Sequence, residues 1–152
     1  MAKKKTAGPR SRRTPVWSVE LERTVPASPA AAERALEEVL QALSRGECAC
    51  GDPDEIRIAL REALNNALRH GSRLDPRQRI HVLCRWSPQQ GLWLVVRDQG
   101  EGFDPHQVPD PTQAENLERF SGRGLHIIRQ LMDKVEFRAG GREIHLRRFP
   151  RA

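Results

Sequence analysis

The chain has 152 residues, of which 38% are hydrophobic and 30% charged, a balance that fits one globular domain with a sizeable core. No apolar run approaches the roughly 20 residues that a membrane span needs, and the basic start lacks the apolar segment of a secretory signal. These features argue against a membrane protein and a secreted precursor, and we expect a cytoplasmic protein.

The net charge of +6 arises at the N-terminus. Residues 1–13 hold six basic side chains and no acidic one, and the remainder holds 20 basic and 20 acidic residues. We therefore expect a basic disordered tail at residues 1–14 and one domain at residues 15–150. Because the folded part is neutral, specific nucleic-acid binding is not expected.

The first half of the domain begins with a strand and a helix. Residues 17–24 alternate apolar and polar side chains, which predicts a strand. Ser28 and Pro29 are typical of a helix cap and first position. Apolar residues then recur with helical spacing to about Ser44.

The remaining elements follow the same signals. They are, in chain order, a helix capped by Asp54 and ending at Gly71, strands at 80–86 and 92–97, a long loop at 103–121, a helix at 125–132, and strands at 135–137 and 144–149. Loops as long as the one at 103–121 are uncommon unless they work as lids or binding segments.

The three cysteines do not suggest a metal site. Cys48 and Cys50 lack the two-residue gap of a zinc knuckle, and no second ligand pair completes a set. We expect three reduced thiols, with Cys84 in the core because it alternates with apolar neighbours.

Three polar residues recur every fourth position in the second helix: Glu62, Asn66 and His70. They share one side of the helix, and a projection places Asn66, but not Asn65, beside the apolar stripe. A carboxamide oxygen suits Mg²⁺, and a carboxylate one turn earlier can accept a proton from an attacking hydroxyl. We therefore predict a magnesium ligand at Asn66 and a catalytic base at Glu62.

Two glycine motifs follow. Asp98 ends a strand and precedes Gly100 and Gly102; its carboxylate can accept a hydrogen bond from an adenine amino group, and glycines let the backbone approach a ligand. The pattern is neither a dinucleotide fingerprint nor a phosphate loop of the G-x-x-x-x-G-K-[ST] type.

The second glycine motif, Gly122-Arg123-Gly124, is expected immediately before the helix at 125–132. Free N–H groups and the positive end of the helix dipole favour phosphate there, and Arg123 adds positive charge. Each motif alone also fits an ordinary turn or hinge, whereas the three in order indicate an ATP site.

These motifs, in this order, resemble the GHKL (Bergerat-fold, histidine-kinase-like) ATPases, and more narrowly the anti-sigma regulatory factor / serine-protein kinase family of bacteria. The resemblance runs from about Trp17 to Arg148. Its most specific elements are residues 59–67 with His70-Gly71, residues 97–105, residues 110–112 with 115–117, and residues 121–125 with 131–133.

The resemblance implies an α+β fold, a two-layer α/β sandwich whose mixed, mostly antiparallel sheet carries helices on one face. It implies ATP and Mg²⁺ as cofactors, with ATP between the second helix and the loop at 104–121. Glu62 matches the family's base, Asn66 its Mg²⁺ ligand and Asp98 its adenine contact. The full set of expected nucleotide-binding residues is Asn66, His70, Asp98, Gly100, Gly102, Gly122, Arg123, Gly124 and Leu125.

The resemblance also implies partners. Such kinases bind a sigma factor and phosphorylate a serine of an anti-anti-sigma (STAS-domain) protein, and related kinases often form homodimers. One departure concerns the last strand: the family often has Gly-Thr before it, with the Thr seating adenine, whereas this chain has Gly141-Arg142.

Two other functions stay open. One is a nucleotide-dependent module that sequesters a partner without kinase activity. The other is a histidine-kinase catalytic domain, which is disfavoured because no His-Glu or His-Asp pair precedes residue 54 on a helix.

Overall fold

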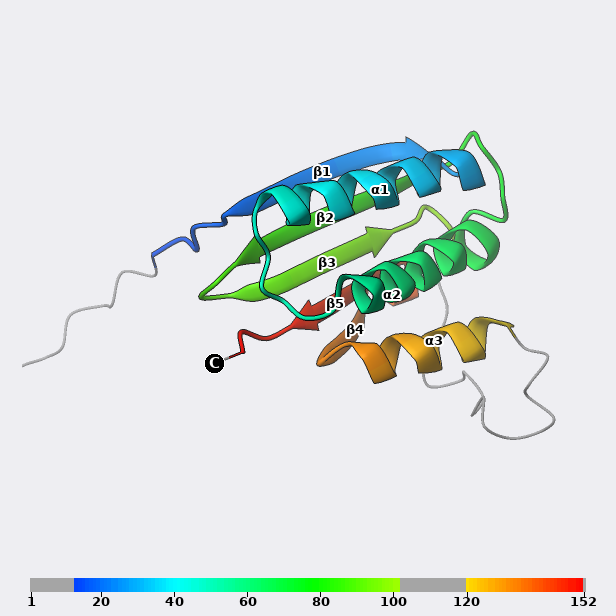
Figure 1. The fold of residues 1–152 in the computed structure, drawn as a ribbon. Helices are drawn as coiled ribbons and strands as arrows, with labels where there is room; N and C mark the ends of the chain where they lie inside the picture. The colour runs from blue at the N-terminus through cyan, green and yellow to red at the C-terminus, as the bar shows by residue number, and fades with distance from the viewer. Residues whose placement is uncertain (1–12, 102–119, 152) are drawn as a thin grey trace, which may run out of the picture.

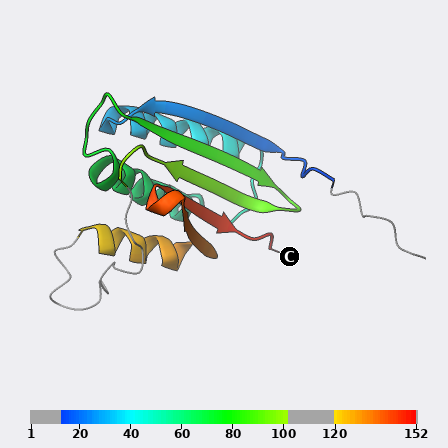
Figure 2. The ribbon, with the colours of Figure 1, turned by 180° about the vertical axis from the view of Figure 1, so that it is seen from behind.

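Five strands form one sheet in the order β1-β2-β3-β5-β4, and the helices α1, α2 and α3 cover one face of it (Figure 1). The computed structural model describes residues 13–101 and 120–151. The expected tail before residue 13, most of the expected loop at 103–121, and Gly102 lie outside these residues. Figure 2 shows the opposite face of the sheet, on which none of these three helices lies.

The strands are β1 (Val19–Pro26), β2 (Arg79–Ser87), β3 (Gly91–Arg97), β4 (Lys134–Arg138) and β5 (Glu143–Arg148). All four pairings among them are antiparallel. The register sets Cys84 opposite Leu94, and Leu94 opposite Leu146, so these three buried side chains form one row across the sheet. The two-layer α+β architecture expected from the sequence is confirmed.

The helices bury their apolar stripes in one core: α1 and α2 lie against the sheet, and α3 packs mainly against α2. They are α1 (Pro29–Arg45), α2 (Pro53–Asn66) and α3 (Phe120–Leu131), with a π-helical turn η1 (Ala67–Gly71) after α2 and a 3₁₀ turn η4 (Ala139–Gly141) between β4 and β5. The apolar stripe expected on the second helix is buried: Ile56, Leu60, Ala63 and Ala67. None of the helices in the described part of the chain is long and apolar enough to cross a membrane.

The helix caps agree with the sequence at α1 and differ at α2. The Ser28 side chain accepts a hydrogen bond from the Ala31 N–H at 3.2 Å, as expected of a cap. At α2 the cap is Asp52, not Asp54, and its Oδ1 accepts from the Asp54 N–H at 2.9 Å. The helix begins earlier because the fixed φ of Pro53 suits the first helical position.

The third helix also begins earlier than expected. Gly122, Arg123 and Gly124 lie inside α3 rather than before it. Glycine costs a helix about 1 kcal/mol relative to alanine, but burial of Leu125 and Ile128 stabilises the whole element. Tertiary packing therefore outweighs local propensity here.

The expectation of three reduced thiols is wrong for two of them. Cys48 and Cys50 form a disulfide in the loop between α1 and α2, with Cα atoms 5.5 Å apart. A rule about metal-ligand spacing does not anticipate a bond between cysteines separated by one residue. Cys84 is free and buried, as predicted, and its burial raises the pKa of its thiol to about 12.

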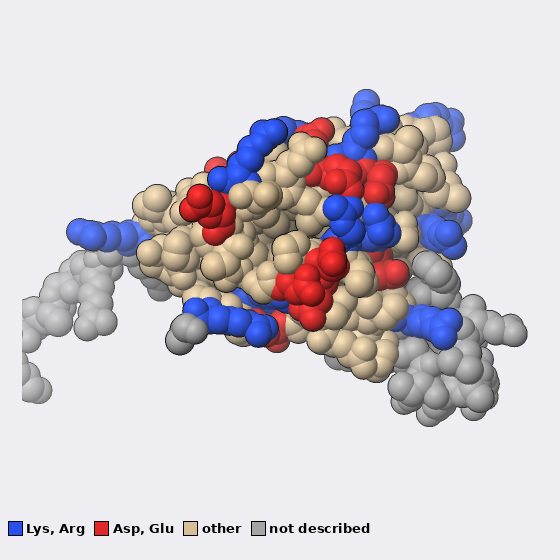
Figure 3. All heavy atoms as spheres, in the orientation of Figure 1, with Lys and Arg blue, Asp and Glu red and all other residues tan. Residues whose placement is uncertain are grey.

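Acidic and basic side chains alternate over the helical face (Figure 3). Two ion pairs, Arg57 with Glu37 and Arg61 with Glu33, link α2 to α1. Both pairs are substantially exposed, so solvent screening leaves them a small part in stability. The apolar stripes, not these charges, hold the helices on the sheet.

Candidate functional site

Two polar side chains of α2 face the beginning of α3. A Cβ atom placed on Gly124 would lie 2.7 Å from Glu62 Oε2 and 3.6 Å from Asn66 Oδ1. A side chain at this position would push the Glu62 carboxylate aside. The structure thus brings Glu62, Asn66 and Gly124 together, although Gly124 is far away along the chain.

The amide oxygen of Asn66 is buried and has no hydrogen-bond partner among the described residues. Buried acceptors are nearly always satisfied, so an orphaned one calls for an explanation. A donor or a cation brought by a ligand would satisfy it, and an oxygen of this kind is among the donors that Mg²⁺ accepts. The described residues hold no cluster of three or more His, Cys, Asp or Glu side chains.

Asp98 lies just beyond β3, with 9% of its surface exposed. Its Oδ1 accepts a hydrogen bond from the Gly100 N–H at 2.7 Å, and its own N–H donates to the Arg142 carbonyl at 2.9 Å. Loss of hydration on burial raises the pKa of this carboxyl, while the Gly100 N–H and the Arg142 charge act in the opposite direction.

The π-helical turn η1 carries the chain from Asn66 to a close contact with Asp98. A Cβ atom on Gly71 would overlap the Asp98 carboxylate, so no other residue fits without moving it. Ser72 closes the turn by donating from Oγ to the Ala67 carbonyl at 3.0 Å. Such π turns are frequent at functional sites, and this one sets the helix end against the strand end.

Asn66, His70 and Asp98 line one pocket, whereas Glu62, which the four-residue spacing places on the same side of the helix, is not among its lining residues. The other lining residues are Ala63, Ala67, Gly71, Val96, Phe137, Gly141, Arg142 and Ile144. The described residues leave about 30 Å³ of space there. The pocket lies where the end of α2 meets the ends of β3 and β5.

Arg142 is the lining side chain that departs most from the expected pattern. Its Nε donates to the Gly100 carbonyl at 2.7 Å, which ties η4 to the glycine motif after Asp98. Arg142 and Asp98 also line a second hollow of about 560 Å³, together with Thr24 and Gln99. Arg142 therefore borders both hollows.

The residues expected to bind phosphate are distributed differently from the sequence-based picture. Gly122 and Gly124 lie within α3, so the N-terminal end of this helix, which favours anions, is upstream of them at Phe120. Arg123 is exposed and Leu125 is buried. Gly102 lies outside the described residues, and the rest of the expected set lines the pocket or borders it.

A family model described as "Histidine kinase-like ATPase domain" matches residues 25–148. The chain belongs to this family. Its membership confirms the resemblance drawn from the motifs and implies nucleotide binding.

The curated relatives of this histidine kinase-like ATPase include proteins named anti-sigma F factor and serine-protein kinase RsbW. The chain is 33% identical over 85 residues to an anti-sigma F factor of Oceanobacillus iheyensis, covering 54% of this chain and 57% of the relative. It is 32% identical over 99 residues to the serine-protein kinase RsbW of Staphylococcus epidermidis, covering 60% and 62%. It is 32% identical over 101 residues to an anti-sigma F factor of Bacillus cytotoxicus, covering 62% and 68%. The first two matches span less than two thirds of those relatives.

The apolar side of the pocket in this ATPase domain was not among the predicted site residues. Val96, Phe137 and Ile144 lie on β3, β4 and β5, and in the sequence they look like ordinary core residues. The only sequence signal for a place in the pocket is that each lies within three residues of a motif position: Asp98, Gly140 or Arg142.

An Asp98→Asn variant is expected to gain stability over the wild type as the pH rises. Above its raised pKa the folded protein holds a desolvated charge that the unfolded chain exposes to water, so stability falls as the pH rises through that pKa. Asparagine stays neutral and still offers an acceptor to the Gly100 N–H.

Urea denaturation of both proteins between about pH 3 and pH 8 checks this expectation. The difference in the free energy of unfolding should vanish in acid, below the pKa of an exposed aspartate. A Glu101→Gln variant is the control, because that side chain is exposed. A difference that does not change with pH would contradict the assigned cause.

Proposed function

We propose that this chain is an ATP-dependent serine-protein kinase of the anti-sigma type. Its substrate is a serine of an anti-anti-sigma (STAS-domain) protein, and its second partner is a sigma factor whose availability it controls. The observation that carries the proposal is the meeting of Glu62 and the unsatisfied Asn66 oxygen at Gly124, next to the pocket that holds Asp98.

Each residue has a role in phosphoryl transfer. Asp98 accepts a hydrogen bond from the adenine amino group, and Asn66 holds the metal through its buried oxygen. Bound Mg²⁺ supplies charge neutralisation of the ATP phosphates. Glu62, one helical turn before Asn66, accepts the proton of the serine hydroxyl.

The second candidate is a module that binds nucleotide and sequesters its target without phosphorylating it. The observation that favours it is Arg142, which lines the pocket and follows Gly141 where the resemblance leads us to expect an adenine-seating Thr. A weakly held or misplaced nucleotide would leave partner binding intact and stop transfer.

Partner capture separates the two candidates. The tagged protein is incubated with lysate from its source organism, with and without Mg-ATP, and the captured proteins are identified by mass spectrometry. A STAS-domain protein that carries phosphoserine only with Mg-ATP supports the kinase. A captured partner that stays unmodified supports the sequestering module.

An Asn66→Ala variant is expected to weaken Mg-ATP binding by about 10- to 100-fold while leaving Mg²⁺-free binding nearly unchanged. The reason is that the variant removes the oxygen proposed to hold the metal and not the adenine contact. Calorimetric titration with ATP, with and without Mg²⁺, measures both values. Asn65→Ala is the matched control on the same helix, and equal losses in both variants would count against a metal role for Asn66.

A further inference from the structure

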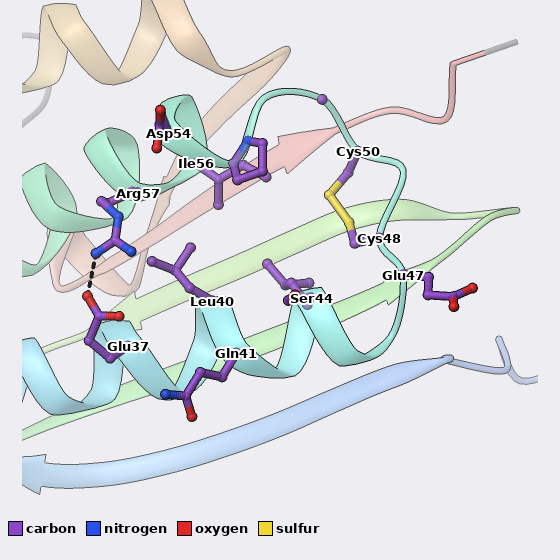
Figure 4. Close-up of a pocket in the computed structure, with 13 residues that line it drawn as sticks. Glu37, Leu40, Gln41, Ser44, Glu47, Cys48, Cys50, Asp54, Ile56 and Arg57 are labelled. Atoms are coloured by element: carbon purple, nitrogen blue, oxygen red, sulfur yellow. Dashed lines mark hydrogen bonds and ion pairs between the residues drawn. A yellow bond between two sulfur atoms is a disulfide. The ribbon is translucent and has the colours of Figure 1, made fainter.

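A groove of about 470 Å³ lies between the C-terminal half of α1 and the first turn of α2, and the Cys48–Cys50 disulfide lies along one end of it (Figure 4). Leu40, Ser44 and Ile56 line its floor, and the Arg57–Glu37 pair stands at the far end. The disulfide can therefore be reached from solvent through this groove. The groove lies at the start of α2, whereas Glu62 and Asn66 lie toward its end.

We propose that Cys48 and Cys50 form a reversible redox site whose reaction partner is a dithiol reductant that enters through this groove. The two sulfurs differ in accessibility: Cys48 is half-buried, whereas Cys50 is 4% exposed. An attacking thiolate therefore reaches the Cys48 sulfur, and the Cys50 sulfur is the leaving group.

The disulfide is poorly placed to serve as a structural staple. It joins two residues of one loop separated by Ala49 alone, and in the chain-entropy description the stabilisation grows with the length of the loop that is closed. It connects no helix to another element. Its reduction should therefore leave the protein folded, which a reversible site requires.

Reduction of this disulfide by a dithiol takes two exchange steps. One thiolate of the dithiol attacks the Cys48 sulfur, the Cys48–Cys50 bond breaks, and Cys50 leaves as a thiolate that takes up a proton. The second thiolate of the reductant then attacks its own sulfur in the mixed disulfide and releases Cys48. The dithiol is oxidised to a disulfide by two electrons, and the protein gains two thiols.

A buried arginine connects this site to the helices that carry Glu62 and Gly124. Arg148 is 2% exposed and donates from Nη1 to the Cys50 carbonyl at 3.1 Å. It also donates to the Leu131 carbonyl at the end of α3, from Nη2 at 2.8 Å and from Nε at 3.1 Å. Its third partner is Glu55 in the first turn of α2.

One side chain thus links the cysteine loop, the start of α2 and the end of α3. Reduction frees Cys50 to move away from Arg148, and this loosens the helix ends that the arginine holds. The redox state of the loop therefore influences how firmly α3 lies against α2.

Thiol trapping tests the site itself. The folded full-length protein is equilibrated in buffers of graded dithiothreitol ratio, alkylated without denaturant, and analysed by mass spectrometry. We expect two alkyl groups, on Cys48 and Cys50, to be gained on reduction and lost on reoxidation, with the buried Cys84 as the internal unreactive control. Free Cys48 and Cys50 thiols in oxidising buffer, or a disulfide that dithiothreitol reduces only after unfolding, would overturn the proposal.

Hydrogen exchange tests the coupling. Reduction should speed amide exchange by about tenfold at residues 51–56 and 129–133, and leave β1 and β2 unchanged. A Cys48→Ser/Cys50→Ser double variant should show the faster rates in both buffers, which controls for effects of the reductant elsewhere. Faster exchange confined to residues 46–50 would overturn the link through Arg148.

Discussion

A Glu62→Gln variant is expected to retain nucleotide binding and to lose serine phosphorylation by about 10²- to 10⁴-fold, the usual contribution of a general base. Glutamine has the same length and keeps the contact with Gly124, so the geometry between α2 and α3 is preserved. What it lacks is a carboxylate that can take the proton of the attacking hydroxyl. The loss should therefore fall on transfer and not on the Kd for ATP.

The measurement uses the partner identified by capture, with transfer followed by phosphoserine mass spectrometry and ATP binding by calorimetry. Glu33→Gln is the matched control, since Glu33 is an exposed glutamate of α1 that pairs with Arg61. Transfer at the wild-type rate in the Glu62 variant would remove the base role and leave Glu62 as a polar helix residue. Equal loss in both variants would point to a general effect of charge.

An Arg148→Met variant is expected to lower the free energy of unfolding by about 3 kcal/mol. Methionine fills similar space, but the Leu131 and Cys50 carbonyls lose their donor, and each buried acceptor without a partner costs about 1–3 kcal/mol. Loss of the ion pair with Glu55 adds little to this cost, because the Glu55 side chain is 44% exposed and its carboxylate can be hydrated instead. The unsatisfied carbonyls, not the broken ion pair, decide the size of the effect.

Arg147→Met is the control for this second variant. Arg147 is the neighbour of Arg148 on β5 but faces the other side of the sheet, where its guanidinium lies 5.4 Å from the centre of the Trp93 ring. A contact of this kind contributes about 0.5–1 kcal/mol at an exposed site. Urea denaturation gives both values, and a loss under about 1 kcal/mol for Arg148→Met would show that the carbonyls find other donors.

Two glycines, Gly124 and Gly71, lie where a polar side chain of another element takes up the room beside them. In the sequence Gly124 reads as part of a flexible hinge before a helix, and Gly71 as a helix end. In the structure Gly124 makes room for the side chains of Glu62 and Asn66, and Gly71 makes room for the carboxylate of Asp98. At Gly71 the crowding group is the hydrogen-bonded carboxylate of Asp98, whereas at Gly124 it is the flexible end of Glu62.

Arg142 is the position at which the sequence and the family pattern disagree. Its backbone carbonyl accepts from the Asp98 N–H and its Nε donates to the Gly100 carbonyl, so it binds two residues of the motif that we propose contacts adenine. It thus supports the loop around Asp98 and also lines the pocket beside it. Because Arg142 contacts both the Asp98 loop and the pocket, the affinity for ATP is the first quantity to measure, before phosphoryl transfer.

Local and periodic features were determined by the sequence alone. The alternation in the strands, the Ser28 cap and the helical stripe from Ile56 to Ala67 specify the α+β layers, because these signals depend only on neighbours along the chain. The same holds for the four-residue spacing that places Asn66 and His70 on one pocket.

Only the tertiary structure decided the features that depend on distant partners. The early start of α3, the Cys48–Cys50 bond, the apolar pocket wall at Phe137 and the burial of Arg148 all follow from contacts between segments far apart in the sequence or from the path of a loop. From the sequence, an arginine at the end of a strand is expected to be exposed, because burying a charge costs free energy. Here three carbonyl bonds and an ion pair offset that cost, and no pattern of neighbours along the chain records where those partners will lie.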